Sequence, residues 1–240
     1  MNNINAPAGI LVKTTLVDYP GRIACAFFFA GCNLRCPYCY NHDLVKIPFS
    51  ENLNSIQDLY SHLEKRRGVI SGLTLSGGEA LLNPETAEIS AYAKNTGYKV
   101  KIDTNGLFPE RLDSLIKNKE TRPDFIAMDL KTTPDRAPLL SENLSPAEYR
   151  EKTSSTIEIL KSLPEDSWEI RTVLVPPLVS MKNIKQLSSF VPENASWQLA
   201  NFLNENCLNP DYCNIQPYTD SQAEEIIQVA KKHVPKARLR

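Results

Sequence analysis

Three of the six cysteines in this 240-residue chain stand close together, at Cys32, Cys36 and Cys39. Their spacing is C-x3-C-x2-C. Cysteine thiolates are the usual ligands of a [4Fe–4S] cluster, and three of them leave one of its four irons without a protein ligand. An open coordination position is typical of a metal that takes part in chemistry. The cysteine pattern therefore predicts a [4Fe–4S] cluster in which one iron accepts another ligand.

The same stretch allows other interpretations. His42 follows Cys39 with two residues between them, so a structural zinc ion with a Cys3His ligand set also fits the spacing. Three buried thiols without any metal are a third option, which the density of cysteines disfavours. The residues of this loop alone leave the zinc alternative open.

The remaining cysteines and histidines give weaker signals. Cys25 lies inside an apolar stretch and is expected to be a buried core residue. Cys207 and Cys213 are too few for a second cluster, which needs about four ligands. We expect them to be passive thiols, with a redox pair or a contact to substrate as the alternatives. His62 and His233 have no site-like neighbours.

The composition excludes several classes of protein. The formal net charge is −1, from 27 basic and 28 acidic residues, so no overall field favours nucleic acid or a membrane surface. The first twenty residues lack a charged-then-apolar signal pattern, and no apolar run approaches the length of a membrane span. We predict a cytoplasmic protein, where clustered cysteines indicate metal or redox chemistry rather than disulfides.

Strand-like and helix-like stretches alternate along the chain. Short stretches, most of them rich in β-branched or aromatic residues, predict strands at 23–30, 69–76, 98–103, 124–130, 168–175 and 197–202. Apolar periodicity and capping residues predict helices at 55–68, 83–97, 145–163 and 221–233. Repeated strand–helix units predict an α/β fold with a parallel sheet.

The length favours a partial barrel over a complete one. A full eight-unit barrel has roughly 31 residues per unit, so six units use about 190. The predicted architecture is a partial (β/α)6 TIM-type barrel in a single domain spanning 1–240. It has a lead-in at 1–22, the barrel at 23–203, and a C-terminal loop and helix at 204–240.

Polar residues recur at or near the ends of the predicted strands. Gly77, Gly78 and Glu79 follow the second strand, and Asp103 with Thr104 ends the third. Further along the chain, Asp129 and Lys131 stand at the end of the fourth strand, while Arg171 lies inside the fifth and Gln198 within the sixth. Such a series is typical of a barrel active site, although each stretch taken alone could be an ordinary βα turn.

The cysteine spacing, with the aromatic Tyr38 just before the last cysteine, resembles the signature of the radical S-adenosylmethionine (SAM) superfamily. The resemblance implies that the amino and carboxylate groups of SAM chelate the open iron. Gly77, Gly78 and Glu79 resemble the second motif of that family, whose backbone and acid receive the SAM amino group. The family usually has Pro after this motif, where the present chain has Ala80.

Within the superfamily the chain is most similar to activases of glycyl-radical enzymes. The stretch "VDYPG" at 17–21 resembles the lead-in of the anaerobic ribonucleotide reductase type, whereas formate-lyase activases usually have Gly where Tyr19 stands. The stretches "DTNG" and "MDLK" resemble a monovalent-cation site beside SAM. Carried over, the ligands are the Asp103 and Asp129 carboxylates, the Thr104 hydroxyl and the Met128 carbonyl, with Lys131 close to SAM.

Gln198 departs from the pattern of formate-lyase activases, and the role of Arg171 is ambiguous. Those activases carry a His near the end of the sixth strand that contacts SAM, where this chain has Gln198 and Asn201. Gln198 could bond a ribose or adenine of SAM, or face solvent. Arg171 could hold a carboxylate of the cofactor, or pair with a neighbouring acid.

The resemblance also implies a reaction and partners. One electron from flavodoxin or ferredoxin reaches the cluster, SAM is cleaved to methionine and a 5′-deoxyadenosyl radical, and the radical takes hydrogen from a backbone glycine of a partner enzyme. By resemblance that partner is an anaerobic ribonucleoside-triphosphate reductase. The alternatives are a radical SAM enzyme acting on a small molecule or peptide, and a zinc or electron-transfer module without SAM chemistry.

Overall fold

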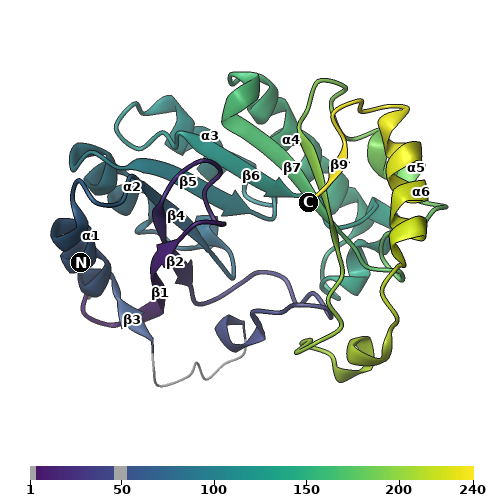
Figure 1. Ribbon diagram of the computed structural model, residues 1–240, viewed down its shortest axis with the longest axis horizontal. Helices are drawn as coiled ribbons and strands as arrows, with labels where there is room; N and C mark the ends of the chain where they lie inside the picture. Colours follow the sequence, from purple (N-terminus) through teal and green to yellow (C-terminus); the bar gives the residue numbers. More distant parts are fainter. Residues whose placement is uncertain (1–3, 46–52) are drawn as a thin grey trace. The chain divides into compact units, whose positions relative to one another are not determined.

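The computed structural model describes residues 4–45 and 53–240 (Figure 1). Contacts within the chain divide it into two compact units, which are described separately. Unit 1 comprises Met1–Asn33, Asn41–Thr104 and Glu110–Ile126. Unit 2 comprises Leu34–Tyr40, Asn105–Pro109 and Ala127–Arg240. The segment with the three predicted cluster cysteines is therefore shared, because Cys32 belongs to unit 1 and Cys36 and Cys39 belong to unit 2.

The sheet of unit 1 has the strand order β3-β1-β2-β4-β5. β2 and β4 pair in parallel, as do β4 and β5, whereas β1 is antiparallel to β2 and to β3. The bounds are β1 Pro7–Thr15, β2 Ala24–Phe29, β3 Asn54–Ser55, β4 Gly72–Gly77 and β5 Lys99–Thr104. The helices are α1 Ile56–Arg66, α2 Thr86–Asn95 and α3 Pro109–Lys117, with short 3-10 helices η1 His42–Leu44 and η2 Ala80–Leu82. In Figure 1, α1 and α2 lie beside these strands.

The sequence explains why β2 is central and where α1 begins. Ala24, Cys25 and Phe27 of β2 are all fully buried, as expected for a continuous apolar strand covered on both faces. Ser55 caps α1 through a capping box with Asp58, in which each side chain bonds the backbone of the other residue. Such a box satisfies two amide groups that the first helical turn leaves unpaired.

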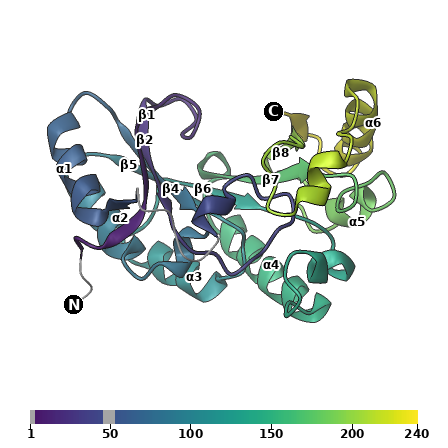
Figure 2. The ribbon, with the colours of Figure 1, turned by 90° about the horizontal axis from the view of Figure 1, so that it is seen from below.

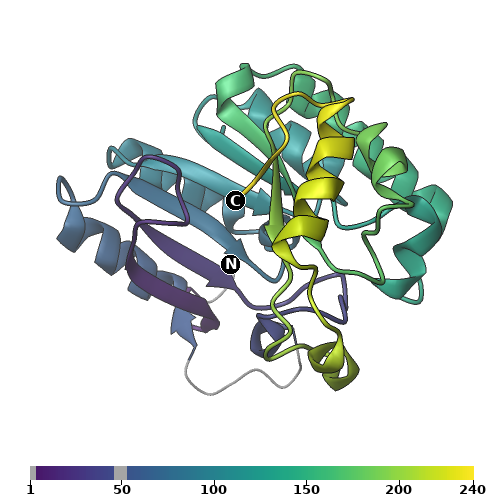
Figure 3. The same cartoon turned by 45° about the vertical axis from the view of Figure 1, so that its right-hand side comes forward.

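In unit 2 the strands β6, β7, β8 and β9 follow one another in chain order. β7 pairs with β8, and β8 with β9, in parallel. The bounds are β6 Phe125–Asp129, which begins in unit 1, β7 Trp168–Leu174, β8 Trp197–Asn201 and β9 Arg238–Leu239. The helices are α4 Pro146–Lys161, α5 Ile184–Ser188 and α6 Asp220–Lys231, with η3 Pro134–Leu139, η4 Glu165–Ser167 and η5 Pro210–Asn214. α6 packs against α5 and β9 (Figures 2 and 3).

The predicted fold class is confirmed: the fold is α/β with parallel strands. The six predicted strands correspond to β2, β4, β5, β6, β7 and β8, and the four predicted helices to α1, α2, α4 and α6. No strand was predicted within the lead-in at 1–22, where the structure has β1, which pairs with β2. The helices α3 and α5 were also not predicted. In the described part of the chain, no helix is both long and apolar enough to cross a membrane.

Candidate cofactor site

In unit 1 the Gly77-Gly78-Glu79 loop lies directly against the backbone around Cys32. Gly78 N donates to Phe29 O at 2.9 Å, and Glu79 N donates to Gly31 O at 3.0 Å. A Cβ added to Gly78 would stand 2.0 Å from Gly31 O and 3.1 Å from the Cys32 Cβ. Only glycine allows this approach, so the first cysteine and the glycine loop form one closely packed backbone feature.

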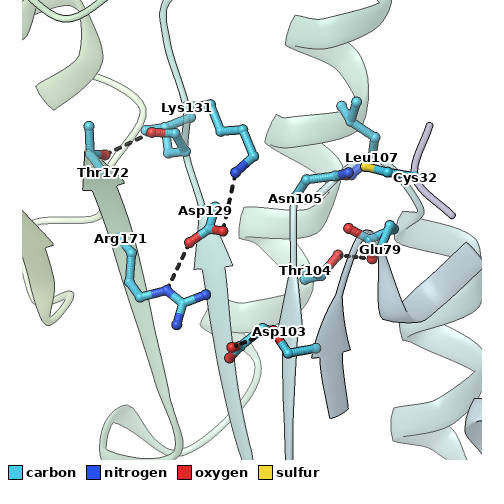
Figure 4. A network of polar contacts seen from close by, with 12 residues as sticks. Cys32, Glu79, Asp103, Thr104, Asn105, Leu107, Asp129, Lys131, Arg171 and Thr172 are labelled. Atoms are coloured by element: carbon cyan, nitrogen blue, oxygen red, sulfur yellow. Dashed lines mark hydrogen bonds and ion pairs between the residues drawn. The ribbon is translucent and has the colours of Figure 1, made fainter. Parts of the chain in front are cut away.

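Glu79 is held in place by two hydrogen-bond donors. Its side chain is 2% exposed, and its Oε1 accepts from Leu81 N at 3.0 Å and from Thr104 Oγ1 at 2.8 Å. Figure 4 shows the Thr104–Glu79 bond between the end of β5 and the glycine loop. Because a buried carboxyl group is costly unless it is hydrogen-bonded, these donors lower the cost of burying Glu79 and fix its direction.

An arginine outside the predicted site secures the turn that follows Glu79. Arg111 Nη1, on α3, donates to the carbonyl oxygens of Leu81 and Leu82 at 2.6 and 2.7 Å. Sequence reasoning missed this residue because no helix was predicted at 109–117. The signal was present: Pro109 precedes Leu112, Leu115 and Ile116, an apolar pattern typical of a short amphipathic helix.

Asp103 is engaged by neighbours on β4 and β5. Its Oδ2 accepts from Ser76 Oγ at 3.0 Å, and its Oδ1 forms an ion pair with Lys101. Lys101 is 1% exposed, so the Asp103 charge helps to compensate a buried ammonium group. The predicted role of Asp103 as a cation ligand stays a prediction. One of its two carboxylate oxygens already pairs with the Lys101 ammonium group.

In unit 2, Cys36 and Cys39 belong to one tight turn. Cys39 N donates to Cys36 O at 2.9 Å, and the preceding Arg35 N donates to Leu140 O at 2.7 Å. Cys36 is buried and Cys39 is half-buried. Tyr38, between them, meets Phe202 edge-on with ring centroids 6.4 Å apart. Burial raises the pKa of Tyr38 far above its usual value, so its phenol is neutral and acts as an apolar support for the turn.

Asp129 lies between two cationic side chains in Figure 4. Its Oδ1 accepts from Arg171 Nε at 2.8 Å and its Oδ2 from Lys131 Nζ at 3.2 Å. Burial alone would raise the pKa of Asp129, but the charges of Arg171 and Lys131 outweigh it and lower the pKa to about 2. Two roles were predicted for Arg171, and the structure shows the second of them, an ion pair with a neighbouring acid. Asp129 is thus firmly ionised.

The other predicted residues of unit 2 are buried. Met128 is fully buried and packs on Gly106, where an added Cβ would stand 2.4 Å from the Met128 Cε. Gln198 is 5% exposed, so the alternative that it faces solvent is wrong. Its amide donates to Ser196 Oγ at 2.8 Å and accepts from Arg238 Nε at 3.0 Å.

The predicted residues fall into two groups. Unit 1 holds Cys32, Gly77, Gly78, Glu79, Asp103 and Thr104, and unit 2 holds Cys36, Tyr38, Cys39, Met128, Asp129, Lys131, Arg171 and Gln198. Within the described residues, the structure has no group of three or more His, Cys, Asp or Glu side chains gathered to hold a metal ion.

The donor set nevertheless fits an iron–sulfur cluster. All six cysteines lie in the described part of the chain, and none forms a disulfide. Cys36 and Cys39 share one turn, and Cys32 is anchored beside the glycine loop, so each thiol comes from a defined backbone position. Thiolate sulfur is the ligand that such clusters use. Fold and donors together define an iron–sulfur protein.

Comparison with known proteins gives the family. The model of the radical SAM superfamily matches residues 27–183, which is more than half of the chain. The chain belongs to the radical SAM superfamily. Its cofactors are therefore a [4Fe–4S] cluster and SAM, and the zinc alternative is set aside.

Individual relatives cover most of the chain. A protein of Methanocaldococcus jannaschii, provisionally named as a glycyl-radical enzyme activating enzyme, is 27% identical over 231 residues, covering 93% of this chain and 91% of its own. The pyruvate formate-lyase-activating enzyme of Clostridium pasteurianum is 29% identical over 182 residues, covering 73% and 72%. The crystal structure of QueE from Escherichia coli aligns over 98% of this chain and 93% of its own, with 12% identity and a TM-score of 0.56. The last comparison supports the fold alone.

Proposed function

We propose that this protein is a radical SAM activase, which generates a glycyl radical on a partner enzyme. The observation that carries the proposal is the combination of the three-cysteine motif with a buried, doubly hydrogen-bonded Glu79 in the glycine loop beside Cys32. Relatives named as activating enzymes support the same class. The electron donor is a flavodoxin or ferredoxin, and the location is the cytoplasm, as the sequence predicts.

Different residues of the chain bind the two cofactors. Cys32, Cys36 and Cys39 bind three irons of the cluster, which when bound supplies the electron for reductive cleavage of SAM. Gly77 has a φ of +111°, and an added Cβ would stand 2.2 Å from Phe29 N. Only glycine fits this close against β2, and the backbone of the loop placed in this way receives SAM together with Glu79 in this proposal. Glu79 is the acid that receives the SAM amino group.

The charged side chains of unit 2 are suited to bind the carboxylate group and the ribose of SAM. Lys131 is close to SAM in this proposal, and Asp129 limits the positive charge that Lys131 and Arg171 present. A monovalent cation held by Asp103, Thr104, Met128 and Asp129 stays part of the proposal. Each Asp129 oxygen already accepts from one cationic donor, so a bound cation has to use a remaining lone pair beside Arg171 or Lys131.

The partner is proposed to be an anaerobic ribonucleoside-triphosphate reductase, on the strength of the "VDYPG" lead-in. That stretch is built into unit 1: Tyr19 is 4% exposed, and its ring lies 6.3 Å from that of Phe125. The carbonyl of Asp18 accepts from Thr74 Oγ1 at 3.2 Å. The stretch therefore supports the choice of partner through its resemblance to the reductase type, while Tyr19 and the Asp18 carbonyl serve the packing of unit 1.

An anaerobic activation assay tests the proposal. The protein, SAM, a reductant and the reductase of the same organism should give a glycyl radical doublet in electron paramagnetic resonance. Replacing the radical glycine of the partner with alanine should remove the doublet and leave SAM binding unchanged, and Cys36→Ala in this protein should remove it as well. If no glycyl-radical enzyme of the organism is activated while deoxyadenosine accumulates with a small metabolite, the proposal is wrong.

A further inference from the structure

Unit 1 contains a cavity beside β1 and α1, and none of the proposed cofactor-binding residues lines it. Its volume is about 500 Å³, within the range of roughly 300–1,000 Å³ that small-molecule sites have. Most of its lining is polar or charged and includes Lys13 of β1 and Asp58, His62, Lys65 and Arg66 of α1. The cavity thus has the size and the polar groups of a ligand site.

Three cationic side chains from two elements line the cavity. Lys13 comes from β1, whereas Lys65 and Arg66 stand in the last turn of α1. Basic residues in that turn interact favourably with the helix dipole, which does not account for Lys13 on a separate strand. The one acid of the lining, Asp58, accepts from Ser55 N and Ser55 Oγ at 2.8 Å each and so caps α1. Three cations against one carboxylate favour an anionic ligand.

His62 joins α1 to β1 at the cavity and adds no charge to it. Its Nε2 donates to Lys13 O at 2.8 Å. Burial lowers its pKa, this backbone bond opposes the effect, and the charges of Arg66, Lys13 and Lys65 lower the pKa further. His62 is therefore neutral at pH 7, and three cations against one carboxylate give the lining a net charge of +2. The sequence showed no site-like neighbours of this histidine, because they come together only when α1 packs against β1.

Arg66 carries a buried hydrogen-bond donor that the protein does not satisfy. Its Nε is buried, and no described residue accepts a hydrogen bond from it. A buried donor without an acceptor is costly, and a ligand oxygen at this position removes that cost. Guanidinium groups bind phosphate through two parallel hydrogen bonds, and lysines bind it as point charges. The unsatisfied donor and the net charge therefore indicate the same kind of ligand.

We propose that this cavity binds a small molecule that bears one or more phosphate groups, with Lys13, Lys65 and Arg66 around the phosphate. A phosphate group with a charge of about −2 at pH 7 balances the charge of the lining. The remainder of the cavity is left for the rest of the molecule, beside the hydroxyl groups of Thr14 and Ser61.

The cavity is distinct from the candidate cofactor site. Lys13 lies near the end of β1 where Thr15 pairs with Ala24, the first residue of β2. The cysteine loop follows the other end of β2, where Ala30 N donates to Ala8 O at 2.9 Å. Binding of a phosphate compound in the cavity therefore goes beyond the proposed function and does not depend on it.

Calorimetric titration with pyrophosphate tests the site. The cluster-loaded protein is titrated without oxygen or reductant, with excess SAM in cell and syringe so that the cofactor site is occupied. We expect one pyrophosphate to bind per chain. Arg66→Gln and Lys13→Gln should each weaken this binding by about tenfold or more, because each removes a cation from the lining. Lys13 is exposed, so its variant tests the site even if Arg66→Gln does not fold. A parent protein that binds no pyrophosphate overturns the proposal.

Arg67→Gln is the matched control. It removes the same charge from the next position of the chain, but Arg67 is exposed, pairs with Glu64 at 3.2 Å and does not line the cavity. This variant should bind pyrophosphate as the parent does, and an equal loss in Arg66→Gln and Arg67→Gln contradicts the site.

Citrate distinguishes phosphate from anions in general. It carries several negative charges on carboxylates and should bind more weakly than pyrophosphate, whereas equally tight binding contradicts the proposed class of ligand. None of these titrations needs the partner enzyme or the cleavage of SAM. A failed glycyl radical assay with normal pyrophosphate binding would therefore count against the proposed function alone.

Discussion

Thr104 Oγ1 donates to Glu79 Oε1 at 2.8 Å, and each of the two side chains is only 2% exposed. The bond joins the end of β5 to the glycine loop that follows β4. It therefore links two motifs that the sequence separates by 25 positions, and a hydroxyl group orients the acid that we propose receives SAM.

Thr104→Val should disturb the position of Glu79, because valine has nearly the volume of threonine but lacks its hydroxyl group. A hydrogen bond to a charged group contributes about 1.5–3 kcal/mol, so we expect SAM affinity to fall by about tenfold or more, since tenfold corresponds to about 1.4 kcal/mol. Equilibrium binding of SAM to the cluster-loaded variant measures the change. Thr104→Ser keeps the hydroxyl and should bind SAM nearly as the parent does. Equal binding by all three proteins contradicts the orienting role.

The Arg171–Asp129 pair should contribute to stability by about 1–2 kcal/mol after allowing for solvent screening of a half-buried pair. The pKa of Asp129 is lowered in the folded protein, from 3.8 to about 2. Its contribution is therefore fully present above pH 3.8 and is lost as pH falls toward 2. A double-mutant cycle of Arg171→Met and Asp129→Asn, followed by urea unfolding at pH 7 and at lower pH, gives the coupling energy. A coupling that does not weaken below pH 3.8 speaks against this ionisation.

Asp129→Ala separates the cofactor role from stability. If Asp129 lies beside SAM, with or without a cation, its loss should weaken SAM binding by tens- to thousands-fold, equivalent to about 2–5 kcal/mol. Cluster iron should stay near normal, because no cysteine is touched. The dependence of SAM cleavage on sodium or potassium, measured in the parent and the variant, checks the cation. Asp103→Ala and Asp129→Ala variants that both bind and cleave SAM like the parent would show that the carboxylates serve only their ion pairs within the protein.

Much of the fold follows from local sequence. Strands such as β2 are short apolar runs, and α1 carries its own capping box, so both can be recognised without knowledge of their neighbours. β1 could not be, because its residues alternate weakly in burial and its place depends on pairing with β2. The five-residue α5 is too short for a clear period.

The candidate site, too, could be predicted from the sequence only in part. Cysteine spacing and the glycine–glutamate motif carry their chemistry in the sequence itself. The partners of the site residues cannot be read from the sequence, because Arg111 reaches the turn after Glu79, and Lys101 reaches Asp103, only in the folded protein. Arg171 was ambiguous for this reason, since the sequence shows an inward arginine but not which acid it meets.

Cys36→Ala should abolish assembly of the cluster. Two cysteines cannot hold the three irons that the protein must ligate, so the variant should contain little iron after anaerobic reconstitution, where the parent holds about four. Cys207→Ala and Cys213→Ala should keep the parent iron content, because those thiols lie outside the motif. Iron and sulfide analysis with the visible absorption spectrum provides the measurement. A colourless parent that contains stoichiometric zinc and takes up no iron contradicts the cluster.

Arg111→Ala should loosen the glycine loop from outside the cofactor site. Arg111 holds the carbonyls of Leu81 and Leu82, and the amide of Leu81 in turn holds Glu79. Without the guanidinium, the turn after Glu79 loses two charge-assisted bonds, so KM for SAM should rise several-fold while cluster iron stays normal. Arg111→Lys should restore part of the loss.

Arg122→Ala is the matched control for this change. Arg122 also donates to a backbone carbonyl, that of Ile116 near the end of α3, at 2.5 Å, but this carbonyl has no bond to the glycine loop. Both alanine variants should lower the free energy of unfolding by a similar amount, about 1–3 kcal/mol for a lost charged hydrogen bond. Only Arg111→Ala should change KM for SAM. If both variants raise KM equally, the effect comes from a weakened α3, and Arg111 has no positioning role of its own.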